Sequence, residues 1–338
     1  MDTIILHEPG RLIRAGTDPP GRPGPGEALV RVHRVGICGT DLHAFQGRQP
    51  FFHYPRILGH ELGVEVVAVG EGVTGLRLGD RCAVEPYLYC GSCTTCRRGK
   101  TNCCTQLRVL GVHVDGGMRE VIALPAWTLH TSATLDLDQF ALVETLCIGA
   151  HAVDRARLEP DEWTLVIGAG PIGLTVVQFA RMAGARIILL ELNEHRVAFC
   201  RQQFDVEHVL DSAGDPVTQL QTLLSGDLPT AVFDATGSAR SMTAALQYVA
   251  NGGRVIFVGI TQETVSFQGP EFHRREMTIL SSRNALGTDL SRVIRLMEDG
   301  TIDTRPWITH RAGVDDIVEQ FPSWLDPGQG VVKALLAF

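Results

Sequence analysis

Hydrophobic and polar positions in the first part of the chain follow patterns that are typical of short strands. Residues Ala28–Val35 alternate with a period of two, and Leu62–Val69 is a β-branched run that closes at glycines. Before these runs, the segment Asp18–Glu27 is so rich in proline and glycine that only a loop fits it. Short strands between glycine turns predict a small β-rich barrel or sandwich domain.

The pattern changes near residue 145, where buried strands begin to alternate with helical runs. Thr164–Ile167 and Arg186–Leu190 are typical of buried strands, and Leu174–Ala183 between them has helical character. Two further strands are expected at Ala231–Asp234 and Arg254–Gly259. This alternation predicts an α/β domain with a doubly wound parallel sheet.

A third segment follows the α/β region. It ends in the apolar run Gly330–Leu336, which we expect to form a strand that returns to the first domain. The length of 338 residues also favours two domains. The expected boundaries are 1–145 for the β-rich domain, 146–284 for the α/β domain and 285–338 for the returning segment.

Composition and charge narrow the possible partners. Hydrophobic residues make up 44% and charged residues 20% of the chain, an ordinary composition for a globular protein. The formal net charge of −8 makes nucleic acid and anionic membranes poor electrostatic partners. Residues Met1–Glu8 lack the basic start and long apolar stretch of a signal peptide, and no stretch has the length of a membrane span. We therefore expect a cytoplasmic protein.

Nine cysteines are unevenly distributed, with five of them between residues 90 and 104. Without a secretory signal, this clustering favours a metal site over disulfides or a loop of free thiols. Four thiolates at gaps of two, two and seven residues can enclose one tetrahedral Zn²⁺ with no open position, which is a structural site. These four are Cys90, Cys93, Cys96 and Cys104. On spacing alone, Cys103 is an equally good fourth ligand.

A glycine-rich turn follows the strand Thr164–Ile167 and opens the next helix. Its residues are Gly168, Ala169, Gly170, Pro171, Ile172 and Gly173. The first glycine permits the tight turn, the second lets a pyrophosphate approach the backbone, and the third lets helix and strand pack closely. The amino end of the helix then faces the phosphate charge. This context predicts a dinucleotide site rather than a turn without a ligand.

An acidic residue at the end of the next strand indicates which dinucleotide binds. Glu191 follows Gly168 by 23 residues, and its carboxylate can accept hydrogen bonds from a ribose hydroxyl. The same carboxylate would repel a 2′-phosphate, so NAD is favoured over NADP. Arg196 is close enough in sequence to contact the cofactor and to weaken this preference.

Two further glycine-bounded segments carry possible metal ligands. Cys38 opens the segment Cys38–His43, and His60 and Glu61 follow Gly59. A thiolate, an imidazole and a carboxylate are mixed ligands that suit a catalytic zinc with an open position for water or substrate. An isolated cysteine and histidine are as often core or surface residues, but the nucleotide motif and the cysteine cluster favour the metal site.

In this combination and order, the motifs resemble those of the zinc-dependent medium-chain dehydrogenase/reductase family, which includes alcohol and polyol dehydrogenases. The resemblance covers essentially the whole chain. Within the family, the chain is most similar to the branch of sorbitol, threonine and L-galactonate dehydrogenases, and the stretches Gly47–Phe52 and Gly111–Gly117 resemble the L-galactonate 5-dehydrogenase type. The resemblance implies a GroES-like catalytic domain with a structural-zinc lobe at about residues 85–110 and a Rossmann domain for NAD. It also implies one catalytic and one structural Zn²⁺.

The resemblance assigns the catalytic metal ligands. Cys38 and His60 match the first two, and Glu61 matches a carboxylate that is a ligand in some members and an exchange ligand in others. In alcohol dehydrogenases the third ligand is a cysteine about 24 residues before the first glycine of the nucleotide motif, but this chain has Glu144 there. Its segment Glu144–Leu146 resembles the Glu-Pro-Leu of sorbitol dehydrogenases, whose glutamate lies at or just behind the metal. We prefer Glu144 for this place. Cys147 is the alternative ligand, unless it is simply a small buried residue.

Thr40 and His43 match the family's proton relay. An alcohol must lose a proton before it gives up hydride, and the implied path runs through Thr40, the cofactor ribose and His43 to solvent. Asp41, between them, is expected to be structural and to cap the following turn.

Other residues match positions around the cofactor and the substrate. By the same resemblance, the nicotinamide half of the cofactor is lined by Thr236, Val258 and Gly259. Arg283 matches an arginine near the nicotinamide or the substrate. Arg48, Arg283 and His113 are candidates to bind a substrate carboxylate, which makes a sugar acid an attractive substrate.

The leading prediction is a zinc-dependent oxidoreductase that transfers hydride from a secondary alcohol of a polyol, sugar or L-galactonate-like sugar acid to NAD. The family forms dimers and tetramers, so a homo-oligomer is expected. The alternative is a zinc-loop interaction or nucleic-acid-binding protein, because the cysteine loop carries Arg97, Arg98 and Lys100. The net charge of −8 disfavours it. A zinc-free quinone-reductase relative is disfavoured by the three mixed metal ligands.

Overall fold

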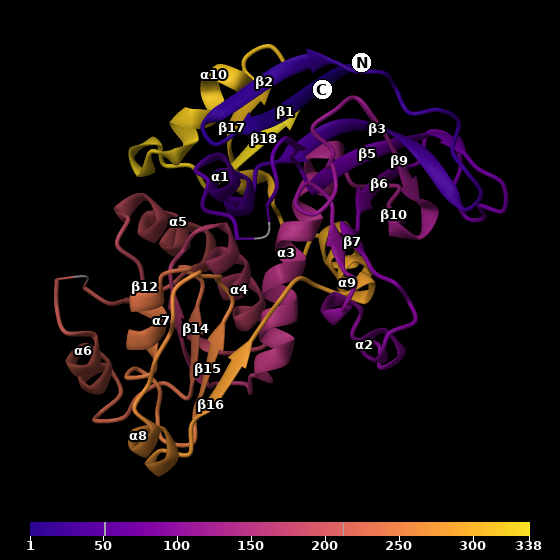
Figure 1. The fold of residues 1–338 in the computed structure, drawn as a ribbon. Helices are drawn as coiled ribbons and strands as arrows, with labels where there is room; N and C mark the ends of the chain where they lie inside the picture. Colours follow the sequence, from indigo (N-terminus) through magenta and orange to yellow (C-terminus); the bar gives the residue numbers. More distant parts are fainter. Residues whose placement is uncertain (51, 212) are drawn as a thin grey trace. The chain divides into compact units, whose positions relative to one another are not determined.

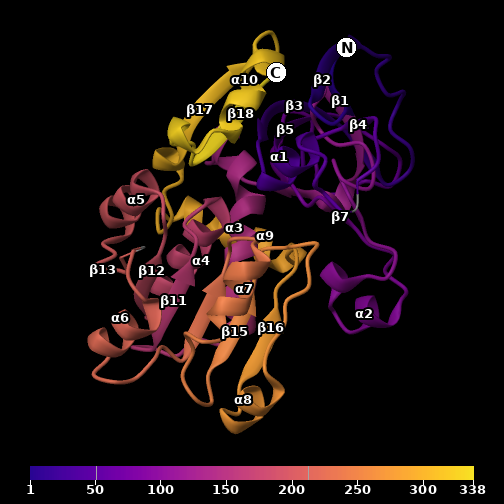
Figure 2. The same cartoon turned by 60° about the vertical axis from the view of Figure 1, so that its left-hand side comes forward.

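The structure, a computed structural model, describes residues 1–50, 52–211 and 213–338. Phe51, which belongs to the Gly47–Phe52 stretch that supports the family resemblance, lies outside the described residues. The chain forms two compact units, one of Met1–Thr145 with Ala285–Phe338 and one of Leu146–Asn284 (Figure 1). Helix α3 (Leu137–Ala156) runs from the first unit into the second (Figure 2).

The first unit is built mainly from antiparallel strands. Its largest sheet has seven strands, in the order β10-β6-β5-β3-β18-β17 with β9 also paired to β3, and a second sheet has the order β2-β1-β4. A hairpin of β7 and β8 carries the cysteine loop. The strands are β1 (Asp2–Glu8), β2 (Arg11–Gly16), β3 (Glu27–Gly36), β4 (Arg56–Ile57), β5 (Glu61–Val69), β6 (Arg81–Val84), β7 (Tyr87–Leu88), β8 (Arg108–Val109), β9 (Val121–Pro125), β10 (Leu129–Thr131), β17 (Ile308–Gly313) and β18 (Lys333–Ala337).

Helices of the first unit are mostly short and connect these strands. The α-helices are α1 (Gly39–Phe45), α2 (Thr94–Arg97), α9 (Gly287–Glu298) and α10 (Ile317–Gln320). The 3₁₀ turns are η1 (Thr101–Cys103), η2 (Ala126–Thr128), η3 (Arg305–Trp307), η4 (Phe321–Leu325) and η5 (Pro327–Gln329).

The C-terminal strand returns to the first unit. β18 is parallel to β17 and antiparallel to β3, with Leu335 opposite Gly36. In Figure 1 the yellow strands β17 and β18 accordingly lie beside the indigo N-terminal strands. This pairing buries Lys333, the first residue of β18, in the interior of the unit.

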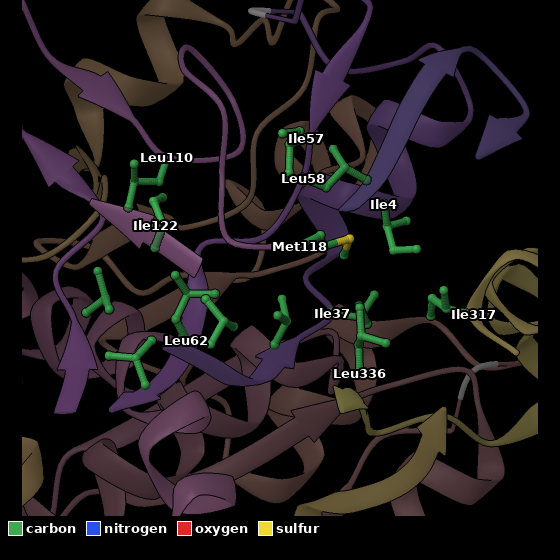
Figure 3. Packing of buried hydrophobic residues seen from close by; sticks show 14 of the residues in the cluster. Ile4, Ile37, Ile57, Leu58, Leu62, Leu110, Met118, Ile122, Ile317 and Leu336 are labelled. Carbon is green, nitrogen blue, oxygen red and sulfur yellow. The ribbon is translucent and has the colours of Figure 1, made fainter. Parts of the chain in front are cut away.

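A large hydrophobic core lies in the first unit. Figure 3 shows part of it, with Leu58 and Met118 next to each other and Ile37 beside Leu336. Period-two alternation buries Ala28, Val30 and Val32 of β3 in this core, as expected for a strand with one face inside, and Val35 is buried after a shift in register. The core thus joins the N-terminal strands, the central loops and the returning C-terminal strand.

The second unit is a doubly wound parallel sheet. Its strands follow the order β13-β12-β11-β14-β15-β16, and each neighbouring pair is parallel, as in a dinucleotide-binding Rossmann fold. The strands are β11 (Trp163–Ile167), β12 (Arg186–Leu190), β13 (His208–Val209), β14 (Ala231–Asp234), β15 (Arg254–Phe257) and β16 (Thr278–Ser281). The helices are α4 (Pro171–Met182), α5 (Glu194–Phe204), α6 (Pro216–Leu223), α7 (Ala239–Ala245) and α8 (Gly269–Arg274). Within the described ranges, no helix of either unit has both the length and the apolar character needed to cross a membrane.

Several element boundaries differ from the predicted ones, and β18, for example, begins at Lys333 rather than at Gly330. Helix α4 begins at Pro171 rather than at Leu174, because proline is well tolerated in the first turn of a helix. Strand β15 ends at Phe257 rather than at Gly259. The backbone turns there because the N–H groups of the next two residues both donate to the Asp234 carbonyl.

Candidate active site

A thiol, an imidazole and a carboxylate meet in the interior of the first unit. Cys38 is the N-cap of α1, Glu61 begins β5, and His60 precedes it. One ligand atom from each residue lies within 4.8 Å of the other two. Gly36 lies opposite Glu61 in the sheet, and a Cβ there would be 2.1 Å from Glu61 Oε2, so only glycine leaves room for the carboxylate. This donor set fits a zinc ion with mixed ligands.

Asp41 lies against the ring of His60. Its Oδ1 is 3.8 Å from His60 Nδ1, and both atoms are buried without a hydrogen-bond partner among the described residues. Its Oδ2 accepts a hydrogen bond of 3.0 Å from the Cys38 backbone N–H, so Asp41 caps the start of its own helix α1 rather than a turn that follows it. Burial lowers the pKa of His60, but the charges of Asp41 and Cys38 outweigh burial and raise it well above its usual value. At 3.8 Å the two atoms are too far apart for a hydrogen bond, so Asp41 acts on His60 through its charge.

A buried lysine beside Glu61 was missed by the sequence analysis. Lys333 Nζ lies 2.7 Å from Glu61 Oε1 and 2.6 Å from Oε2, and it donates to the Ile37 carbonyl at 3.3 Å. Burial lowers the pKa of Lys333, but the Glu61 charge more than compensates, so the pKa is raised and the ammonium stays charged. The sequence does contain a signal for this pair, which is a single lysine in an otherwise apolar strand. Because an unpaired lysine is almost never fully buried, such a residue indicates a buried acidic partner.

Glu144 lies on α3 and is not a member of the three-residue metal-ligand group. Its Oε1 accepts a hydrogen bond from the buried Tyr87 hydroxyl, a contact that sequence reasoning did not find. Burial raises the pKa of Glu144, and the nearby charge of His60 offsets part of this effect. Cys147 is fully buried three residues further along α3, in the part that belongs to the second unit.

Thr40 and His43 both lie on α1, close in sequence to its N-cap Cys38. Thr40 is half-buried and His43 is exposed, which suits the inner and outer positions of a path to solvent. Partial loss of hydration, and then the charge of Arg48, lower the pKa of His43. The imidazole therefore stays neutral, and able to accept a proton, to a lower pH than an ordinary histidine.

The cysteine loop gathers four sulfur atoms into a closed group. The Sγ–Sγ distances are 3.5 Å for Cys93–Cys96, 3.5 Å for Cys90–Cys104 and 3.9 Å for Cys93–Cys104. Four sulfurs at about 2.3 Å from a central Zn²⁺ lie about 3.8 Å from one another, so the group fits this metal. Cys103 is exposed and lies outside the group.

Local hydrogen bonds favour thiolates in this loop. The Thr95 hydroxyl is the main cause that lowers the pKa of Cys93 to about 4, and hydrogen bonds from Ser92 lower the pKa of Cys90. The pKa of Cys96 is raised to about 12, first by loss of hydration and then by neighbouring sulfurs. Because zinc binds the thiolate, two of the four ligands are already biased toward the binding form.

The glycine turn of the second unit has the shape that a pyrophosphate needs. Gly168 has a φ of +85°, which favours glycine. A Cβ on Gly173 would be 1.8 Å from the Gly168 carbonyl oxygen, so the third glycine is required where helix and strand meet. Pro171 and Ile172 are the first two residues of α4, whose amino end presents unpaired N–H groups to an anion.

Glu191 is anchored at the carboxyl end of β12. Its Oε2 accepts a hydrogen bond of 2.6 Å from Ala169 N–H, and its Oε1 accepts from the next two backbone N–H groups at 2.7 and 2.8 Å. Arg196 Nη1 lies 3.8 Å from Glu191 Oε2 and 3.7 Å from where a Cβ on Gly170 would be. The turn thus places a carboxylate and a guanidinium side by side.

The other residues predicted for the cofactor lie at the carboxyl ends of β14 and β15, or beyond β16. The Thr236 N–H and hydroxyl both donate to the Asp234 carboxylate, at 2.9 and 2.7 Å. Val258 and Gly259 donate to the Asp234 carbonyl at 2.9 and 3.1 Å. Arg283 is exposed shortly after β16. Ligands of open α/β sheets bind at the carboxyl ends of the strands.

Two family models match the chain. Residues 24–133 match the alcohol dehydrogenase GroES-like domain, and residues 171–299 match the zinc-binding dehydrogenase family. The fold and the site thus define a zinc- and dinucleotide-dependent oxidoreductase. The chain belongs to the zinc-dependent medium-chain dehydrogenase/reductase family, within which it is an NAD-dependent alcohol or polyol dehydrogenase. This result confirms the predicted fold class, reaction class and cofactors.

Individual relatives cover the whole length of the chain. It is 37% identical to L-galactonate-5-dehydrogenase of Escherichia coli (strain K12) over 338 residues, 100% of this chain and 99% of the relative. It is 32% identical to 2-dehydro-3-deoxy-L-galactonate 5-dehydrogenase of Pseudoalteromonas atlantica (strain T6c / ATCC BAA-1087) over 316 residues, 93% of this chain and 92% of the relative. A crystal structure of the alcohol dehydrogenase rspB from E. coli CFT073, complexed with NADH, has a TM-score of 0.93 at 30% identity and covers 100% of this chain and 99% of that one.

Proposed function

We propose that this enzyme oxidises one secondary hydroxyl of a sugar acid or a related polyol and passes the hydride to NAD. The observation that carries the proposal is the buried group of Cys38, His60 and Glu61 in a chain whose second unit has a glycine turn closed by Glu191. Two relatives named as 5-dehydrogenases of galactonate-type acids support the substrate class.

The residues of the first unit bind the metal and move the proton. Zinc held by Cys38, His60 and a carboxylate supplies a Lewis acid for the substrate oxygen. Thr40 would accept the hydroxyl proton while it gives up its own to the relay, and neutral His43 would accept a proton from the relay and release it to solvent; its lowered pKa keeps the imidazole neutral to a lower pH. The path to solvent matters because hydride leaves readily only from the deprotonated alcohol.

The residues of the second unit bind and orient the cofactor. Gly170 admits the pyrophosphate, and Glu191 accepts hydrogen bonds from the adenosine ribose. Arg196 lies beside both Glu191 and Gly170, and we propose that its positive charge binds the pyrophosphate. When Arg196 binds the pyrophosphate, it does not neutralise Glu191, whose negative charge can then repel the 2′-phosphate of NADP. Binding at these points fixes the direction in which the nicotinamide is presented for hydride transfer.

Arg48 is the strongest candidate to bind a substrate carboxylate. It is exposed, it lies in the same unit as the metal ligands, and its charge acts on His43. His113 is a poorer candidate, because its Nδ1 already accepts a 3.1 Å hydrogen bond from the Val109 N–H. Arg283 belongs to the second unit.

A panel of sugar acids, uncharged polyols and simple secondary alcohols, followed by NADH absorbance, tests the function. We expect the highest kcat/KM with a sugar acid. Arg48→Gln should raise the KM for sugar acids by about 10-fold or more and leave the KM for polyols within about twofold. Arg22→Gln, which changes an exposed arginine in the proline-rich loop, is the control. Absence of turnover with all polyhydroxy substrates would contradict the proposal.

We also propose that the enzyme is a homo-oligomer, a dimer or a tetramer, as family members are. Light scattering on the eluted protein measures the mass directly. A monomer at micromolar concentration would contradict this proposal and leave the assigned reaction unaffected.

A further inference from the structure

Tyr87 connects the cysteine loop to the group around the candidate catalytic metal. It is the first residue of β7, where it pairs with Val109 of β8, and Cys90 follows three residues later. Its side chain is one of the largest that are fully buried, and its hydroxyl donates a hydrogen bond to Glu144 Oε1. The proton path and the metal ligands do not account for this contact.

The two buried glutamates near the metal ligands are held in different ways. Both oxygens of Glu61 lie within 2.7 Å of Lys333 Nζ, so a cation neutralises this carboxylate. Glu144 instead accepts a hydrogen bond from a neutral phenol, at Oε1. Among the described residues, its Oε2 has no hydrogen-bond partner, and the side chain keeps 5% exposure. Glu144 therefore presents an oriented carboxylate oxygen as an acceptor.

We propose that Tyr87 is a positioning residue for substrate specificity. Its hydroxyl fixes Glu144 so that Oε2 accepts a hydrogen bond from a substrate hydroxyl adjacent to the one that is oxidised. A substrate without that second hydroxyl cannot make this hydrogen bond, and a site built to hydrogen-bond a hydroxyl discriminates strongly against an analogue that lacks it. The enzyme thereby prefers a vicinal diol to a monohydric alcohol. The inference rests on the proposed function, because it requires a polyhydroxy substrate.

This role assigns Glu144 to the substrate rather than to the metal. Cys38, His60 and Glu61 already form a complete set of three mixed ligands. Glu144→Gln should therefore retain as much zinc as the wild type. Loss of zinc from this variant would show that Glu144 is a metal ligand and would overturn the proposal.

The test compares the best polyhydroxy substrate of the panel with 2-butanol in the wild type and in Tyr87→Phe. We expect Tyr87→Phe to lower kcat/KM for the polyhydroxy substrate by about 10–100-fold and to change kcat/KM for 2-butanol by less than about threefold. Tyr54→Phe is a matched control in the same unit, because it removes a tyrosine hydroxyl that donates to the Ala44 carbonyl at 2.5 Å. The control should keep the wild-type ratio between the two substrates.

A double-mutant cycle with Glu144→Gln shows whether Tyr87 acts through Glu144. We expect Glu144→Gln alone to reduce the preference for the diol, and Tyr87→Phe to add less than about threefold in that background. Should Tyr87→Phe fail to fold, Glu144→Gln by itself must still reduce the preference. Equal losses on both substrates, or additive losses in the cycle, would overturn the positioning role. A wild-type enzyme inactive on every polyhydroxy substrate would instead contradict the proposed function.

Discussion

The ammonium group of Lys333 lies within 2.7 Å of both carboxylate oxygens of Glu61, and neither side chain has exposed surface. The two residues are 272 positions apart in the sequence. Their contact attaches the last strand of the chain to a candidate metal ligand. Folding of the C-terminal strand and the charge around the metal are therefore coupled, because removing either partner leaves an uncompensated charge in the interior.

We expect Lys333→Met to lower the free energy of unfolding by about 3–5 kcal/mol, because methionine leaves the Glu61 carboxylate without its cation. Urea unfolding of the zinc-free protein measures the loss, since bound metal would stabilise the carboxylate. Lys100→Met, at an exposed lysine of the cysteine loop, should change stability by less than about 0.5 kcal/mol. Adding Glu61→Gln to Lys333→Met should recover part of the loss, and a further decrease would show that the two residues are not a pair.

Much of the fold could be predicted because strand and helix periods are properties of neighbouring residues. The predicted strands Arg186–Leu190 and Ala231–Asp234 coincide with β12 and β14. The errors at the start of α4 and the end of β15 arise where a proline in the first turn and a backbone contact with Asp234 set the boundary. Such local features do not change the periodic pattern of hydrophobic and polar residues, so this pattern cannot predict the boundary.

The site was less predictable, because part of it depends on contacts between distant segments. Cys38 and His60 stand in short motifs that can be recognised without a structure. Tyr87 and Glu144 are 57 positions apart, and nothing in the local sequence of either residue indicates the other. In the sequence, Lys333 stands out only as an unexpected cation in an apolar strand. Its partner, Glu61, can be identified only when the position of this strand in the sheet is known.

Replacing Glu191 with glutamine should narrow the preference for NAD over NADP. The carboxylate repels a 2′-phosphate, whereas glutamine carries no charge; its single oxygen can keep the Ala169 N–H, but the bonds from Leu192 and Asn193 are lost, which affects both cofactors alike. We expect the ratio of kcat/KM for NAD to that for NADP to fall about 10-fold or more, which corresponds to about 1.4 kcal/mol. Glu194→Gln, in the exposed first turn of α5, should leave the ratio unchanged. Equal kcat/KM for the two cofactors in the wild type would refute this role of Glu191.

The pH dependence of the reaction should respond to the pair of Arg48 and His43. The pKa of His43 is lowered by loss of hydration and by the Arg48 charge, so activity should persist to a lower pH than an ordinary histidine allows. Arg48→Gln removes one of the two causes, which raises the pKa of His43. The acid limb of the kcat profile should therefore move to higher pH. An uncharged polyol is the substrate for this measurement, so that carboxylate binding does not enter, and an unchanged limb would contradict the relay.

Removing the imidazole itself tests the same path more directly. We expect His43→Ala to keep its zinc and its affinity for NAD and to lower the rate by about 10–100-fold, because water can replace part of the relay. Its acid limb should also change, since the titrating group is gone. A variant with the wild-type rate and the wild-type profile would mean that the proton leaves by another route.

Loss of the structural zinc site should lower stability without removing catalysis, which distinguishes it from the catalytic zinc site. Cys93 belongs to a closed group of four sulfurs, in which the Thr95 hydroxyl favours the thiolate, whereas the adjacent Cys103 is exposed and outside the group. Elemental analysis should find two zinc ions per chain in the wild type and in Cys103→Ser, and one in Cys93→Ser.

Because binding to a closed site contributes folding energy, Cys93→Ser should lower the free energy of unfolding by about 3 kcal/mol or more. The catalytic metal should remain, so kcat per folded molecule should stay within about threefold of the wild type, as the site keeps its own ligands. One zinc per wild-type chain, or equal stability of the two serine variants, would show that the cysteine loop is not a structural zinc site.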